Sequence, residues 1–183
     1  MIAASSEKDS ITTNGMSFLA RSNEFCNAAI VCPVDLSKDG NIFAGMDLQQ
    51  QIEQHAYRPG YLAPAQLTEH FLQERTDTLP LRTSYRPGVY GGDISTLLPG
   101  FISERLKSAL HKFDTIFRGF VKASVLIAPE TRTSSPIRIT RERDRLNALN
   151  ISGLYPAGEG SGYAGGIVSS AVDGWKLGSG FRI

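Results

Sequence analysis

A glycine-rich stretch near the end of the chain constrains the fold more than any other feature. Six glycines fall within the fourteen residues 153–166, and the residues that follow have the pattern of an amphipathic helix. Residues Gly160 to Gly165 match G-x-G-x-x-G, with an apolar segment before them and a helix expected after them. In a dinucleotide-binding fold, such glycines allow a tight turn and bring the backbone close to a phosphate or a ring.

The position of this motif leaves no room for a complete dinucleotide-binding unit behind it. Only 18 residues follow Gly165, and they must contain the helix itself. The second parallel strand, with an acidic residue about 20 positions on, cannot be completed. Two interpretations remain: a bare glycine-rich loop, or the last strand–helix unit of a sheet whose other strands lie elsewhere. We favour the second, because a parallel strand needs a partner and is normally buried on both faces.

In this interpretation, residues 153–157 form a short buried strand and a helix runs from about Gly165 to Gly174. Glu159 follows the strand directly, where its carboxylate can accept hydrogen bonds from hydroxyls of a sugar type. The start of the helix, residues 163–167, offers free backbone N–H groups and the positive end of the helix dipole. The stretch therefore predicts a site for a ligand that carries hydroxyls and negative charge.

The rest of the chain predicts a small, mainly antiparallel sheet with several helices. Short apolar runs indicate strands at residues 28–34 and 120–128. Apolar residues at helical spacing indicate helices at 46–57 and 99–117. Pro64 is placed where the first residue of a further helix is expected. The fold class is therefore α+β, with the C-terminal strand–helix unit as an addition.

Composition and charge narrow the function classes. With 41% hydrophobic residues and a net charge of +1, the chain can bury a core and has no electrostatic reason to bind nucleic acid. No apolar run approaches the roughly 20 residues of a membrane span, and the N-terminus lacks the features of a secretory signal. The two cysteines and three histidines have no disulfide or metal-site spacing. We expect a cytoplasmic protein with no metal, membrane or nucleic-acid partner.

Six segments of the chain carry a resemblance to a known family. They are NGMSFLAR, NAAIVCPV, YLAPAQLTEHFL, YRPGVYGGDISTLLP, ETRTSSPIRI and GLYPAGEGSGYAGGIVSSAVDG. In this order they resemble segments of the bacterial FAD-dependent, NAD(FAD)-utilising dehydrogenases, which belong to the wider glutathione-reductase-like flavoproteins. The resemblance implies that residues 1–128 are an inserted substrate-type α+β domain. It implies that residues 129–183 are the C-terminal part of a Rossmann-like FAD-binding domain, whose N-terminal ADP-binding half is absent from this chain.

The resemblance also implies a flavin site. Gly158 and Glu159 match the pair that meets the ribityl and pyrophosphate region of FAD. Residues 162–167 match the turn and helix start beneath the pyrimidine ring of the flavin, and residues 132–136 match a stretch beside the isoalloxazine ring. The implied cofactor-binding residues are Arg132, Thr133, Ser134, Ser135, Gly158, Glu159, Gly162, Tyr163, Gly165, Gly166 and Ile167. No catalytic acid or base is implied.

Two functions from different classes follow from these observations. The first is the C-terminal portion of a FAD-dependent oxidoreductase, with NAD(P)H as a candidate reductant and an unidentified small-molecule substrate. The alternative is a catalytically silent folded module, or fragment, that needs a partner chain carrying the Rossmann half. An apolar strand with an exposed edge at residues 153–157 would also favour association into a homo-oligomer. In either case we expect the isolated chain to be inactive.

Overall fold

The computed structural model describes residues 1–3, 5–36, 40–77 and 81–180. The chain divides into two compact units. Unit 1 consists of Met1–Val34 and Gln49–Thr131, and unit 2 consists of Asp35–Leu48 and Arg132–Ile183. Because compactness does not say what each part binds, the predicted division into a substrate-type domain and part of a FAD-binding domain stays a prediction.

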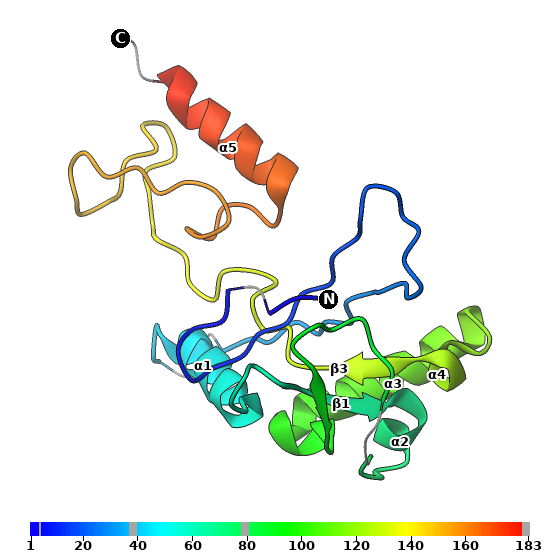
Figure 1. The fold of residues 1–183 in the computed structure, drawn as a ribbon. Coiled ribbons are helices and arrows are strands. Elements are labelled where there is room, and N and C mark those ends of the chain that lie inside the picture. The colour runs from blue at the N-terminus through cyan, green and yellow to red at the C-terminus, as the bar shows by residue number, and fades with distance from the viewer. Residues whose placement is uncertain (4, 37–39, 78–80, 181–183) are drawn as a thin grey trace. The chain divides into compact units, whose positions relative to one another are not determined.

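Unit 1 is built on a three-stranded sheet with the strand order β2–β1–β3 (Figure 1). The central strand β1 (Ala63–Leu67) pairs in parallel with β2 (Val89–Gly91) and antiparallel with β3 (Val125–Ile127). The helical elements around this sheet are α2 (Thr68–Leu72), the 3₁₀-helix η1 (Ile94–Leu97), α3 (Gly100–Ile116) and α4 (Phe120–Ala123). The predicted α+β class is confirmed, with a sheet that holds one parallel and one antiparallel pair.

The core of unit 1 explains why its helices form where they do. One cluster of buried residues consists of Ile11, Ala56, Ala63 and Tyr85, and a second consists of Phe71, Ile94 and Leu110. Helix α3 contributes Ile102 and Leu110 from the apolar stripe that the sequence shows, so the helix predicted at 99–117 is confirmed. The helix predicted at 46–57 is α1 (Ala44–Ala56), which buries Ile52 and Ala56. Burying each large side chain contributes about 1.5–3 kcal/mol.

Pro64 does not begin a helix, which corrects the prediction. It lies in the central strand β1, and the next helix starts only at Thr68. The four residues Ala63 to Gln66 are all buried, so tertiary burial prevails over the local signal for a helix start. Proline has no N–H to donate, but its carbonyl accepts the N–H of Ala128 at 3.2 Å, and this bond ties β1 to the end of β3.

Two predicted strands also differ from the structure. Residues 28–34 form no strand, and Val31 is 52% exposed, because no described strand pairs with this apolar run. Within residues 120–128, only Val125–Ile127 forms a strand. The first part of this run forms helix α4, whose Val121 N–H donates to a carboxylate oxygen of Asp114 at 3.0 Å.

Within its described residues, unit 2 consists of helix α5 (Ile167–Gly180), the start of α1 and irregular segments. The strand predicted at residues 153–157 is absent there; Leu154 accepts one backbone hydrogen bond, from Ala148 at 2.7 Å, and the segment has no strand beside it to complete a ladder. The predicted helix is present but continues past Gly174, because an internal glycine costs a helix only about 1 kcal/mol.

Candidate functional site

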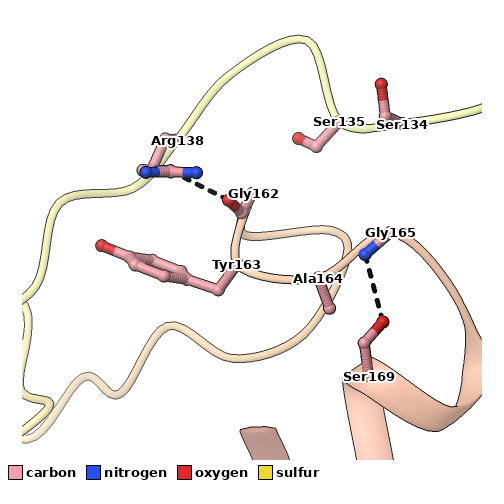
Figure 2. Close-up of a pocket in the computed structure, with 8 residues that line it drawn as sticks. All are labelled: Ser134, Ser135, Arg138, Gly162, Tyr163, Ala164, Gly165 and Ser169. Carbon is pink, nitrogen blue, oxygen red and sulfur yellow. Dashed lines mark hydrogen bonds between the residues drawn. The ribbon is translucent and has the colours of Figure 1, made fainter.

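A pocket of about 560 Å³ lies within unit 2, where the glycine-rich turn faces the segment that follows unit 1. Figure 2 shows its walls: Ser134, Ser135 and Arg138 on one segment, and residues 162–165 on the turn opposite. The lining residues are Ser134, Ser135, Arg138, Gly162, Tyr163, Ala164, Gly165 and Ser169. The two segments that the resemblance assigned to the flavin ring therefore form one hollow.

The turn owes its shape to two glycines with left-handed backbone conformations. Gly158 has φ +69° and Gly162 has φ +80°, a region that side chains disfavour. The Gly162 N–H donates to the carbonyl of Glu159 at 2.8 Å, and the Tyr163 N–H donates to the carbonyl of Gly158 at 3.0 Å. These bonds close the turn and present the ring of Tyr163 to the pocket.

The facing segment packs directly on this turn. A Cβ atom on Gly162 would lie 2.6 Å from the Ile137 carbonyl oxygen and 3.0 Å from Cα of Arg138, so only glycine permits the approach. The Ser135 hydroxyl lies 3.2 Å from the Gly160 carbonyl, the Ile139 N–H donates to the Ser161 carbonyl at 3.2 Å, and Nε of Arg138 donates to the Gly162 carbonyl at 2.9 Å. These hydrogen bonds join the two segments that line the pocket.

An ion pair fastens the turn to α5. The Arg141 guanidinium binds the Asp173 carboxylate through two nitrogens, at 3.0 and 2.6 Å, and these side chains are only 9% and 12% exposed. Asp173 also accepts the N–H of Gly158 at 2.9 Å, and Arg141 lies 3.7 Å from the centre of the Tyr163 ring. The hydrogen bond from Arg141 holds the pKa of Asp173 below its ordinary value, and the Gly158 N–H adds to this effect against the opposing effect of burial.

Helix α5 begins at the edge of the pocket. The Ser169 hydroxyl accepts the N–H of Gly165 at 3.2 Å and donates to the carbonyl of Gly166 at 3.0 Å, so it stabilises the entry into the helix. The N–H groups of a first helical turn have no partner within the helix and favour negative charge nearby. Arg138 is the charged residue among those that line the pocket.

The last residue of unit 1, Thr131, is held by hydrogen bonds just before the segment that lines the pocket begins. The Thr131 hydroxyl donates to the Glu53 carboxylate at 2.5 Å, and its carbonyl accepts the side-chain N–H of Gln49 at 2.8 Å. Glu53 is 1% exposed, so this contact is protected from water. The chain then continues through Arg132 and Thr133 into Ser134.

The structure brings together five of the predicted cofactor-binding residues. Ser134, Ser135, Gly162, Tyr163 and Gly165 line the pocket, whereas Arg132, Thr133, Gly158, Glu159, Gly166 and Ile167 do not.

Three of the predicted residues that lie outside the pocket have a different role or position in the structure. The carbonyl of Glu159 closes the turn, Gly158 donates to Asp173, and Ile167 begins α5 as a residue that is 90% exposed. The assignment of all eleven residues to a cofactor stays a prediction.

Arg138 and Ser169 line the pocket but were not predicted from the sequence, and Ala164 was predicted only as part of the range 162–167. Arg138 belongs to the segment ETRTSSPIRI that carries the resemblance, so a signal was present, but its contact with the turn depends on the fold. Ala164 lies inside the glycine motif, and only the shape of the turn decides which of its residues face the pocket.

Within the described part of the chain, no helix is long and apolar enough to cross a membrane. Among the same residues there is no group of three or more His, Cys, Asp or Glu side chains that could hold a metal ion.

Comparison with known proteins identifies relatives. A protein from Clostridium beijerinckii, described only as an uncharacterized protein, is 37% identical over 185 aligned residues. The match covers 97% of this chain but 34% of the relative, so the chain spans about a third of that protein's length. The family described as "FAD-dependent protein, C-terminal domain-like" matches residues 1–133, which end just before the first pocket residue. The chain belongs to this family of C-terminal domains of FAD-dependent proteins.

Proposed function

We propose that this chain is the C-terminal portion of a FAD-dependent oxidoreductase and that its pocket holds a polar edge of the flavin. The observation that carries the proposal is that the segment of Ser134, Ser135 and Arg138 meets the glycine turn in one pocket, since the family resemblance implies a flavin contact for residues 132–136 and for residues 162–167. When bound, FAD would supply hydride transfer between a nicotinamide cofactor and an unidentified small-molecule acceptor.

The donor set of the pocket fits such a group. Serine hydroxyls both donate and accept hydrogen bonds, and a guanidinium only donates, which suits the carbonyl and ring-nitrogen edge of a flavin. The first turn of α5 adds N–H groups and a positive dipole end, which favour the negative charge of a reduced flavin. In this function the chain orients the cofactor, and residues 132–133 and 158–159 would contact it from outside the pocket.

Exposed apolar residues on α5 support a larger assembly. Ile167, Val168, Val172 and Trp175 are 90%, 76%, 46% and 72% exposed, and the last three lie on one helix face at spacings i, i+4 and i+7. Apolar surface of this kind normally marks an interaction site. The partner that fits best is the Rossmann-like half of a glutathione-reductase-like flavoprotein, carried on the longer polypeptide that the relative's length indicates.

The same observation supports the alternative function. A chain whose C-terminal helix has an uncovered apolar face can fold as a silent module and bind flavin only when a partner half, or a second copy, completes the site. The two functions differ in one property: whether the chain alone binds flavin.

Filling the pocket provides the test. Ala164→Phe places a large side chain in the pocket wall, and we expect it to weaken FAD binding at least tenfold relative to the unaltered chain, because the ring occupies the volume that the ligand needs. Ala157→Phe is the matched control, since Ala157 is exposed and lies outside the pocket. Binding is measured by titrating the purified chain with FAD and following flavin absorbance and fluorescence.

Saturable binding near micromolar FAD, lost in Ala164→Phe and kept in Ala157→Phe, would support the proposal. A folded chain that binds no FAD would rule out an autonomous flavin site and leave the silent module. Equal binding by both variants would place the flavin elsewhere.

A further inference from the structure

Two arginines approach the ring of Tyr163, and their surroundings differ. The guanidinium of Arg141 lies 3.7 Å from the ring centre and that of Arg138 lies 5.1 Å from it. Both contacts lie in the range of cation–π attraction. The ring of Tyr163 therefore forms a wall of the pocket and is held in place by two cations. Whether either arginine can also bind a ligand depends on the partners that its guanidinium already has.

The charge of Arg141 is already neutralised within the protein. Its guanidinium forms the two-pronged ion pair with Asp173 and also donates to the carbonyl of Pro156. Only 9% of the side chain is exposed. The guanidinium of Arg141 therefore serves the structure, because it already donates to the Pro156 carbonyl and to Asp173 of α5.

The charge of Arg138 has no such partner. Its Nε donates to the neutral carbonyl of Gly162, and no ion pair found among the described residues involves it. The side chain is exposed and lines the pocket, as Figure 2 shows, and none of the eight lining residues is acidic. Among the hydrogen bonds of the described residues, the Arg138 side chain donates only through Nε, so its two terminal nitrogens are left for a ligand.

We propose that Arg138 makes this pocket an anion site, in which its guanidinium binds a negatively charged group of the ligand. The inference deepens the proposed function and rests on it for the identity of the ligand, a flavin nucleotide. Two parts of that ligand carry the required charge: the phosphate and the reduced ring. A guanidinium suits either, because its planar donors form charge-assisted hydrogen bonds to adjacent acceptor atoms. Arg138, and not the predicted Arg132, is the cation that lines the pocket.

The test compares Arg138→Gln with Arg143→Gln. Arg143 lies in the same unit, is exposed and is outside the pocket, so the control removes the same charge without touching the site. Inorganic phosphate is titrated first, at low ionic strength, while NMR follows the amide signals of Gly162, Tyr163 and Gly165. Riboflavin, FMN and FAD are then titrated, and the reduction potential of the bound flavin is measured for each variant.

We expect phosphate to shift these amide signals in the unaltered chain and in Arg143→Gln but not in Arg138→Gln. If Arg138 binds the phosphate of the nucleotide, Arg138→Gln will weaken FMN about tenfold and leave riboflavin unchanged. If Arg138 instead binds the reduced flavin ring, Arg138→Gln will lower the reduction potential of bound riboflavin, which has no phosphate, and not only that of bound FMN and FAD. Arg138→Lys keeps the charge without the planar donors and is expected to restore part of the loss.

Other outcomes separate the two proposals. If flavins bind but Arg138→Gln and Arg143→Gln behave alike in every titration, the anion site is wrong while the proposed function stands. If phosphate binding depends on Arg138 but no flavin binds, the anion site stands and the flavin function of the chain alone is wrong. If neither phosphate nor flavin binds the folded chain, both are overturned.

Discussion

Asp173→Ala is expected to lower the free energy of unfolding by about 2 kcal/mol, because it leaves the guanidinium of a part-buried ion pair without its carboxylate. The substitution removes the two carboxylate oxygens that accept from Arg141, which leaves the guanidinium with the Pro156 carbonyl, and it removes the acceptor of the Gly158 N–H. Arg141, only 9% exposed, would then keep its charge with little access to water. Urea unfolding followed by circular dichroism measures the effect. Asp144→Ala, an exposed carboxylate of the same unit, is the control and should change stability by less than about 0.5 kcal/mol.

The same pair predicts how stability depends on pH. The pKa of Asp173 in the folded chain lies below its ordinary value of 3.8, first because of Arg141 and then because of the Gly158 N–H. A lowered folded pKa means that the unfolded chain takes up the proton first as the pH falls. The stabilisation is therefore complete above about pH 4 and is lost as the pH falls through the folded pKa.

The difference in unfolding free energy between the unaltered chain and Asp173→Ala should accordingly shrink on acidification. A difference that stays constant from pH 7 to pH 3 would contradict this account of the ion pair. A difference near zero at pH 7 would show that Arg141 finds enough water, or another acceptor, to make Asp173 dispensable.

Gly162→Ala is the second substitution with a large expected effect. The new Cβ would meet the Ile137 carbonyl oxygen at 2.6 Å, and the residue would have to keep φ +80°. The backbone conformation alone costs about 1–2 kcal/mol for a residue with a side chain. The clash is with backbone, which cannot move aside without breaking the contact between Arg138 and the turn, so we expect a total of at least about 2 kcal/mol.

Gly160→Ala is its matched control, two residues away in the same turn. No atom lies within 4 Å of a Cβ at this position, and its φ is not in the left-handed region. We expect a change near zero, or a slight stabilisation through the lower entropy of the unfolded chain. Thermal unfolding of both variants measures the contrast. Equal melting temperatures for the two would mean that the close approach at Gly162 is not required.

The sequence was most informative where a local pattern and the tertiary structure agree. Helix α3 presents a continuous apolar stripe, and the glycines of the turn include the two that need a left-handed conformation, so both features could be predicted. Helix α5 was predictable from its local apolar pattern alone, although most of its large apolar residues are exposed. Its end was not, because nothing local distinguishes a glycine that stops a helix from one that a helix tolerates.

Prediction failed where pairing between distant segments decides the structure. Pro64 is a good first residue for a helix in isolation, but burial of β1 between two strands outweighs that preference. The apolar runs at 28–34 and 153–157 looked like strands because strand propensity says nothing about whether a partner is present. Arg138 was missed for a related reason: its role depends on the position of a turn more than twenty residues further along the chain.

The position of Trp175 on the uncovered face of α5 gives the chain an intrinsic optical reporter. It is the single tryptophan among the 183 residues, and the residue is 72% exposed. Emission excited at the red edge of protein absorption therefore comes from one known point on this helix. A partner that covers the face would move that emission to shorter wavelengths, and a flavin held nearby would accept its excitation energy. Assembly and cofactor capture can thus be followed separately in the unlabelled protein.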